Sequence, residues 1–179
     1  HRDLKPANMM LVHYEDDPHY LKVLDFGIAK SFAEEGASHK QHTQGAIGTP
    51  TYMAPEHFTG AQVDNRTDLY SMGILLYELL AGKPPFIREK TYQSPMIGMT
   101  DYHLKMEPPP IRRKRPESPQ ALEDVVMKAR EKRPEARFQT ATAFKEAIQT
   151  VQLAPSGTEP IVATPTPSEQ ELPALAPAP

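Results

Sequence analysis

Cysteine is missing from this 179-residue sequence, so neither disulfides nor thiolate metal sites can hold the chain together. No apolar run approaches the roughly 18 residues that a membrane-spanning helix needs. The first residues, HRDLK, contain no apolar segment of the kind found in a signal peptide, and the first residue is not methionine. We therefore expect a segment of a longer cytoplasmic protein, whose membrane anchor, if it has one, lies beyond residue 179.

The C-terminal stretch lacks aromatic and basic residues. Residues 155–179 hold seven of the 20 prolines and three glutamates, but no lysine or arginine. A segment of this composition cannot bury enough apolar surface to offset its ordering entropy. We therefore assign residues 153–179 to a disordered tail or linker rich in proline, alanine and threonine, and residues 1–152 to one folded domain.

The folded part has no excess of charge of either sign. Three of the 23 acidic side chains lie in the tail, so residues 1–152 carry 20 acidic and 20 basic groups. A neutral body gives no reason to expect nucleic acid or an anionic membrane as a partner. The basic run at 112–115 has no interleaved aromatic residues and fits a solvated loop better than a nucleic-acid site.

Hydrophobic spacing predicts a mainly helical domain with one small β-hairpin. Apolar runs at 9–12 and 21–24 flank the turn-forming residues 15–18, which favours an antiparallel pair. Residues 65–81 are rich in helix formers and apolar on several sides, which predicts a buried central helix. Gly82 and the prolines after it would end that helix.

Other elements are predicted by caps and by missing periodicity. A short helix is expected near 99–106. Ser118 is predicted to cap a helix with Pro119 at its first position, and Thr140 to cap a later one. Residues 31–49 show no apolar period and predict a loop of a length that compact domains usually keep for a function.

Three short motifs point to one chemistry. The first eight residues, HRDLKPAN, match the H-R-D-L-x-x-x-N catalytic loop of protein kinases. The sequence DFG follows at 25–27 and APE at 54–56, in the order that kinases require. The chain thus resembles the protein kinase superfamily, and Lys5 with residues 48–56 resembles its serine/threonine branch as found in bacteria.

The residue types in these motifs suit phosphoryl transfer. Because this reaction offers little covalent chemistry to the protein, catalysis consists of positioning groups and neutralising charge. Asp3 is suited to accept the proton of the attacking hydroxyl, and Lys5 to place a cation beside the γ-phosphate of ATP. Asn8 and Asp25 offer the hard oxygen ligands that Mg²⁺, or Mn²⁺ in its place, prefers. The expected cofactors are therefore ATP and Mg²⁺.

Several roles near the nucleotide are implied by the resemblance alone. Met10 resembles the residue beneath the adenine ring, and Thr49 resembles the threonine that hydrogen-bonds to the Asp3–Lys5 pair. His1 and Phe26 look like the stacked pair that joins the catalytic loop to the metal-binding segment, which Gly27 completes.

The resemblance also implies scaffold roles. Asp68 resembles the acid that accepts main-chain N–H groups of the catalytic loop, although an acid at that point also suits the helix dipole. Glu56 and Arg137 resemble a buried ion pair that anchors the end of the long loop.

Arg2 predicts a mode of regulation. Beside Lys30 it would form a cationic pocket for a phosphate group on the 31–49 loop. Thr43 is the preferred phosphorylation site, ahead of Ser38.

The resemblance covers residues 1 to about 152 and implies the large, C-terminal lobe of the two-lobed α+β kinase fold. The parent protein would transfer phosphate from ATP to serine or threonine of proteins in signalling, including itself.

The sequence holds neither a G-x-G-x-x-G-x-V loop nor the lysine of V-A-I-K, so we expect the segment alone to be inactive. The alternative is an inactive lobe that acts as a binding or regulatory module. Lys5 and Thr49 disfavour a tyrosine kinase, and together with residues 54–56 they also disfavour a small-molecule phosphotransferase.

Overall fold

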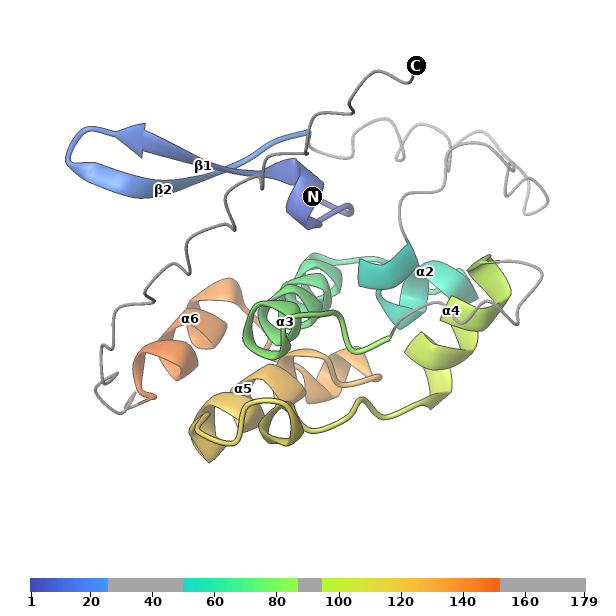
Figure 1. Cartoon of the computed structure of the whole chain (residues 1–179). Coiled ribbons are helices and arrows are strands. Elements are labelled where there is room, and N and C mark those ends of the chain that lie inside the picture. Colours follow the sequence, from blue (N-terminus) through green and yellow to red (C-terminus); the bar gives the residue numbers. More distant parts are fainter. Residues whose placement is uncertain (26–49, 87–94, 152–179) are drawn as a thin grey trace, which may run out of the picture.

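The structure, a computed structural model, describes residues 1–25, 50–86 and 95–151 (Figure 1). Helices dominate this part of the chain, as the sequence predicted. They are α2 (Pro55–Thr59), α3 (Asn65–Ala81), α4 (Pro95–Lys105), α5 (Gln120–Ala129) and α6 (Ala141–Gln149). Short 3₁₀ turns lie at Pro6–Asn8, Pro50–Tyr52, Ile111–Arg113 and Pro134–Ala136. The predicted loop 31–49 and the predicted tail 153–179 lie outside the described residues.

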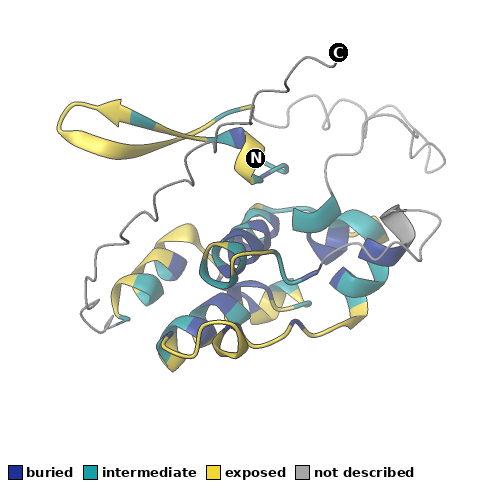
Figure 2. Ribbon diagram, in the orientation of Figure 1, coloured by how far each residue is buried: buried dark blue, intermediate teal, exposed yellow. Residues whose placement is uncertain are grey.

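The only sheet among the described residues is the predicted antiparallel hairpin. Strand β1 (Met9–Tyr14) pairs with β2 (Asp17–Val23), with Leu11 opposite Leu21. The strands are longer than predicted because the turn is tight, with Glu15 in the left-handed region at φ 52°. Asp17 and Pro18, which we placed in the turn, belong to β2 instead. The hairpin projects from the helical body and is exposed along most of its length (Figure 2).

Helix α3 has the predicted bounds because both of its ends are capped. The Asp64 carboxylate accepts the Arg66 N–H at 2.8 Å. Gly82 adopts φ 77°, and its N–H donates to the Glu78 carbonyl at 2.8 Å. A left-handed residue after the last turn is the usual way for a helix to end, and glycine adopts it without steric cost.

The core surrounds α3 on three sides. Leu69 packs with residues of α5, α6 and the segment between them, and Ile74 packs against Ala54, which precedes α2. Tyr77 packs against Ile111 and Val126 on a third side. Helix α3 is therefore the buried central helix that its sequence predicted, and it supports the other elements (Figure 1).

Helices α3 and α5 approach each other at Gly73. A Cβ atom added at Gly73 would lie 3.0 Å from the Cβ of Ala129 and 3.3 Å from the main-chain nitrogen of Arg130. Side-chain carbons do not normally approach that closely, so the absence of a side chain at residue 73 permits the contact.

The remaining helices confirm one predicted cap and correct another. Thr140 caps α6 as predicted, with its hydroxyl oxygen accepting the Ala143 N–H at 3.1 Å. Ser118 does not cap α5, because Pro119 is extended and occupies the cap position itself. The helix therefore starts one residue later than predicted. Helix α4 begins at Pro95, earlier than the predicted residue 99. Within the described ranges, no helix is both long and apolar enough to cross a membrane.

Candidate functional site

The first residues are held in place by Asp68, near the start of α3. The Asp68 carboxylate lies 2.7 Å from the main-chain nitrogen of His1 and accepts the Arg2 N–H at 2.9 Å. Arg2 has φ 67°, a left-handed conformation that costs a non-glycine residue about 1–2 kcal/mol. The two hydrogen bonds from α3 hold the chain in this conformation, which is the geometry expected of Asp68.

Asp3, Lys5 and Asn8 form a compact cluster. The Lys5 ammonium donates to the Asp3 carboxylate at 2.9 Å, and about a fifth of each side chain is exposed. The Asn8 amide nitrogen donates to the Asp3 main-chain carbonyl at 2.8 Å and lies 3.4 Å from the carboxylate. The 3₁₀ turn at Pro6–Asn8 brings Asn8 back over Asp3. This arrangement leaves the Asn8 amide oxygen available as a ligand.

His1 connects this cluster to the end of β2. Its Nε2 atom lies 2.9 Å from the Leu24 carbonyl, and its Nδ1 atom accepts the Asp3 N–H at 3.3 Å. Because a carbonyl oxygen only accepts, the proton of a neutral ring sits on Nε2. The ring therefore links the segment that carries Asp3 to the segment that carries Asp25.

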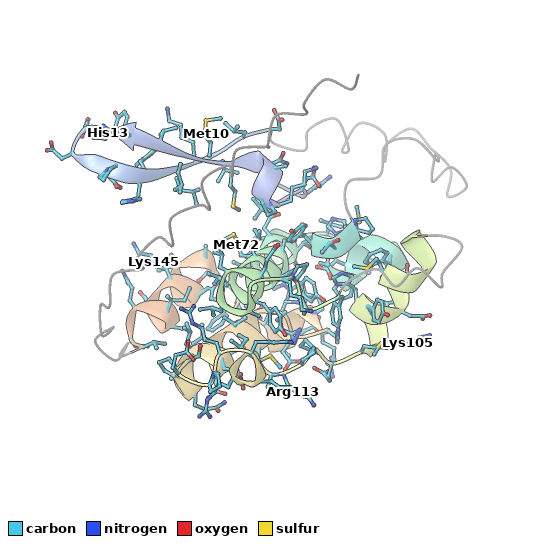
Figure 3. The ribbon with its side chains drawn as sticks, in the orientation of Figure 1. Met10, His13, Met72, Lys105, Arg113 and Lys145 are labelled. Carbon is cyan, nitrogen blue, oxygen red and sulfur yellow. The ribbon has the colours of Figure 1, made fainter. Side chains whose placement is uncertain are left out.

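The two predicted metal ligands lie at the root of the hairpin. The Leu24 N–H donates to the Asn8 carbonyl at 2.8 Å, which brings Asp25 beside the start of β1. Asp25 is exposed and has φ 53°, a second left-handed residue in the site. Met10 follows on β1 and is half exposed (Figure 3). One amide and one carboxylate oxygen fit Mg²⁺, which normally completes its shell with water and phosphate oxygens.

A buried ion pair joins the start of α2 to the segment before α6. The Arg137 guanidinium donates to both carboxylate oxygens of Glu56, at 2.8 and 2.9 Å, and Thr67 donates to the same carboxylate at 2.6 Å. Burial alone would raise the pKa of Glu56, but the hydrogen bonds from Arg137 and Thr67 hold it below its usual value. The Arg137 guanidinium also donates to three main-chain carbonyls, including that of Arg66, so each of its nitrogens has a partner within the protein.

Contacts that sequence reasoning missed hold the segment before α2. The Tyr52 hydroxyl donates to the Glu78 carboxylate at 2.7 Å, and the Ser71 hydroxyl donates to the Tyr52 carbonyl at 2.8 Å. Burial and the neighbouring carboxylate raise the pKa of Tyr52. This segment and the residues Arg2 and Asp3 line a common small cavity of about 10 Å³. The one feature of the sequence that could have indicated these contacts is Glu78, an acidic residue near the end of a helix predicted to be buried.

His103 of α4 packs against α2 and α3. It is fully buried, its Nδ1 lies 2.9 Å from the Tyr70 hydroxyl, and its ring stacks on Phe58 at 5.6 Å. Burial, and then the charge of Lys132, lower the pKa of His103 to about 3. The ring is therefore neutral at physiological pH.

Comparison with known proteins identifies the family. Residues 1–149 match the protein kinase domain. The chain belongs to the protein kinase domain family. The chain is 41% identical over 155 residues to the serine/threonine-protein kinase pkn3 of Myxococcus xanthus, an alignment that covers 84% of this chain and 27% of that protein. It is also 41% identical over 145 residues to the serine/threonine-protein kinase PknB of Mycolicibacterium smegmatis, covering 81% of this chain and 22% of that protein.

These relatives confirm the recognition of a bacterial-type serine/threonine kinase from the motifs. The chain spans about a quarter of the length of either relative. Five residues that the sequence assigned to the site lie outside the described residues: Phe26, Gly27, Lys30, Thr43 and Thr49. The stacking, the regulatory pocket and the threonine contact predicted for them therefore stay predictions.

Proposed function

We propose that the protein transfers the γ-phosphate of ATP to serine and threonine hydroxyls of other proteins, and of itself, in signalling. Residues 1–152 would form the large, C-terminal lobe of the catalytic domain, and residues 153–179 a tail. The observation that carries the proposal is the cluster in which the Lys5 ammonium contacts the Asp3 carboxylate at 2.9 Å and the Asn8 amide contacts the carbonyl and carboxylate of Asp3. The two relatives named as serine/threonine kinases support the choice of acceptor.

Asp3 would orient the attacking oxygen. Its carboxylate would accept a hydrogen bond from the substrate hydroxyl and take up the proton as the new bond to the γ-phosphorus forms and the bond from that phosphorus to the oxygen of the leaving ADP breaks. Lys5 would stay beside Asp3 and donate to the transferred phosphoryl group, whose oxygens carry spreading negative charge. Because the Asp3 carboxylate already holds the Lys5 side chain in place, less conformational entropy would be lost when ATP binds.

The root of the hairpin would hold the metal and the nucleotide. Asn8 and Asp25 would supply oxygen ligands to Mg²⁺, which would contribute positive charge beside the phosphates of ATP. Met10, exposed on β1, would lie under the adenine ring. His1, fixed between Asp3 and Leu24, keeps the two ligand segments in register, and Phe26 and Gly27 would continue that contact.

The residues around Tyr52 would support the peptide substrate. Tyr52 and Ser71 fix the main chain before α2 on α3, and Glu56 with Arg137 fixes the helix that follows. Thr49, at the start of this segment, would hydrogen-bond to the Asp3–Lys5 pair and so couple substrate binding to the catalytic cluster.

Phosphorylation of Thr43 would switch the site on. A phosphate there adds about −1.5 to −2 charges and would pair with Arg2 and Lys30. Thr43→Ala should lower activity at least tenfold in the full-length protein, with Ser38→Ala as the matched control. Full activity of Thr43→Ala, with Thr43 unmodified by mass spectrometry in the active protein, would contradict this switch.

The test of the proposed function uses the full-length protein, labelled ATP with Mg²⁺, and mass spectrometry of the phosphorylated residues. Asp3→Asn should remove detectable transfer, a loss of at least about 100-fold, because the proton acceptor is gone. Asp16→Asn, in the exposed turn of the hairpin, is the matched control and should retain the wild-type rate. Equal rates for wild type and Asp3→Asn, or phosphate only on tyrosine, would overturn the proposal.

The same assay separates the alternative function, a lobe that only binds or regulates partners. The 179 residues contain no glycine-rich loop and no V-A-I-K lysine, so we propose that they are inactive on their own. If the full-length protein also fails to turn over ATP, the binding module becomes the better description.

A further inference from the structure

A groove on the helical body lies outside the candidate catalytic site. It has a volume of about 380 Å³ and runs between the C-terminal ends of α3 and α4 and the segments that follow them. Aromatic side chains and prolines give it an apolar lining: Tyr77, Pro84, Pro85, Phe86, Tyr102 and Pro109. The rings of Phe86 and Tyr102 stack with centroids 5.6 Å apart and planes 9° apart, which makes a flat surface. The Tyr77 hydroxyl donates to the Pro109 carbonyl at 2.9 Å and fixes one wall.

The groove is also basic. Lys83 and Lys114 line it. The ammonium of Lys132 lies 5.0 Å from the Phe86 ring centroid and donates to the Tyr102 carbonyl at 3.2 Å. These cations favour an acidic ligand.

Arg130 adds a buried charge beside the groove. Burial lowers the pKa of Arg130, and the negative charge of Glu107, which lines the groove, acts in the opposite direction. Arg130 is only 2% exposed, and its Nε and Nη1 atoms have no hydrogen-bond partner among the described residues. A buried cation without full hydrogen bonding is costly, so nearby negative charge is stabilising. Glu107 supplies part of it, and an acidic ligand would supply more.

The chain itself contains a segment of matching chemistry. Residues 168–175 read SEQELPAL, with two glutamates, two leucines and a proline, and no basic residue occurs anywhere in 155–179. Proline-containing segments bind aromatic-lined grooves at a low ordering cost, because proline restricts the free chain already.

We propose that residues 168–175 of this same chain bind in the groove between α3 and α4. Glu169 and Glu171 would meet Lys83 and Lys114, while Leu172 and Pro173 would lie on the stacked rings. The surface is independent of the proposed kinase activity.

The connection between the body and this segment is long enough. Sixteen residues separate Val151 from Ser168, and such a chain spans about 50 Å when extended. A domain of this size has a radius of gyration of about 15 Å, so the segment reaches the groove. Because the two partners are in one molecule, the effective concentration is in the millimolar range, and a weak groove is sufficient.

Disulfide trapping tests the proposal, since the 179 residues contain no cysteine. The protein is the full-length chain, with any cysteine outside these residues changed to serine. Met106→Cys in the groove is paired with Gln170→Cys in the segment. The control pair is Lys145→Cys with Gln170→Cys. Lys145 lies on α6, across the helical body from α4 and closer in sequence to residue 170 (Figure 3).

The 106–170 disulfide should form at least tenfold faster than the 145–170 disulfide. Random collisions would instead favour the shorter 145–170 loop. Equal rates would overturn the proposal, and so would disulfides that form only between two molecules, because the groove would then take a second copy or another partner.

Charge reversal tests which residues are recognised. Glu169→Lys with Glu171→Lys should slow the 106–170 disulfide at least fivefold, whereas Glu159→Lys, in the same tail, should leave it unchanged. Equal effects of the two changes would overturn the proposal.

Hydrogen exchange gives a readout without cysteines. Main-chain amides of residues 104–107 should exchange more slowly in the wild-type full-length protein than in the Glu169→Lys, Glu171→Lys variant. Identical exchange in the two proteins would count against binding.

Discussion

At the scale of single residues, Glu56 and Arg137 form the most deeply buried ion pair within the described residues. Removing one partner leaves the other charge buried and uncompensated, so Arg137→Leu should destabilise the full-length protein by about 3–5 kcal/mol. Arg133→Leu is the matched control, because Arg133 is 83% exposed and contacts Glu135 only at 3.7 Å. Its effect should stay within about 0.5 kcal/mol. Urea unfolding at pH 7 measures both, and equal losses would contradict the assignment.

The same pair sets an acid limit to stability. The pKa of Glu56 is lower in the folded protein than in the unfolded chain, so its contribution is complete above the ordinary value of 4.5. It is lost as the pH falls through the folded pKa, and Arg137→Leu should reduce that loss.

His103 predicts a second pH dependence of the same sign, because its folded pKa is also lowered. The pKa of His103 is about 3 in the folded protein and 6.5 for an unperturbed histidine, so between these values the unfolded chain binds a proton that the folded protein does not bind. The free energy of unfolding therefore rises with pH in this window, by up to about 1.4 kcal/mol per pH unit. His103→Gln should flatten the dependence measured between pH 5 and 7. His19→Gln, exposed on β2, should retain it, and an unchanged slope in His103→Gln would refute the prediction.

At the scale of elements, the contact of α3 with α5 at Gly73 predicts a sensitive position. Gly73→Val places a branched side chain where even a Cβ would lie 3.0 Å from Ala129, and such overpacking costs about 1–3 kcal/mol. Leu79→Val on the same helix is the control, since Leu79 is 74% exposed and meets no such contact. The midpoint of urea unfolding should fall for Gly73→Val far more than for Leu79→Val. Similar midpoints would contradict this prediction, because they would mean that α5 can move away from α3 without loss of stability.

The bounds of a helix were predictable where the residues that cap it lie directly next to it in the sequence. Helix α3 has an aspartate cap and a terminal glycine within its own sequence, and the prediction of 65–81 is confirmed. Helix α5 starts later than predicted because Pro119 is extended, a choice that its local sequence leaves open.

The contacts of the candidate site were likewise predictable only where they are local in sequence. Asp3, Lys5 and Asn8 belong to one motif of eight residues, so it was predictable that their side chains lie close together. Tyr52 and Glu78 are 26 residues apart and belong to no shared pattern, so only the fold brings them together.

At the scale of the whole molecule, the hairpin predicts self-association of the 179-residue chain. Met10, Leu11 and Leu21 are 50%, 65% and 46% exposed, and hairpins with exposed apolar side chains tend to pair with one another. Light scattering should show concentration-dependent oligomers. Leu11→Glu with Leu21→Lys, which face each other across the strands, should reduce them, whereas His13→Glu with His19→Lys should have a smaller effect. A monodisperse wild-type monomer with one sharp thermal transition would contradict this.

The tight turn at the tip of the hairpin has a practical consequence. Glu15 and Asp16 are exposed at the end of the hairpin opposite to its root, where Leu24 bonds to Asn8. A foreign peptide inserted between Glu15 and Asp16 would lengthen a loop in solvent and leave the root unchanged. The tip is therefore a suitable place for an epitope tag or a fluorescent reporter that follows the protein in cells.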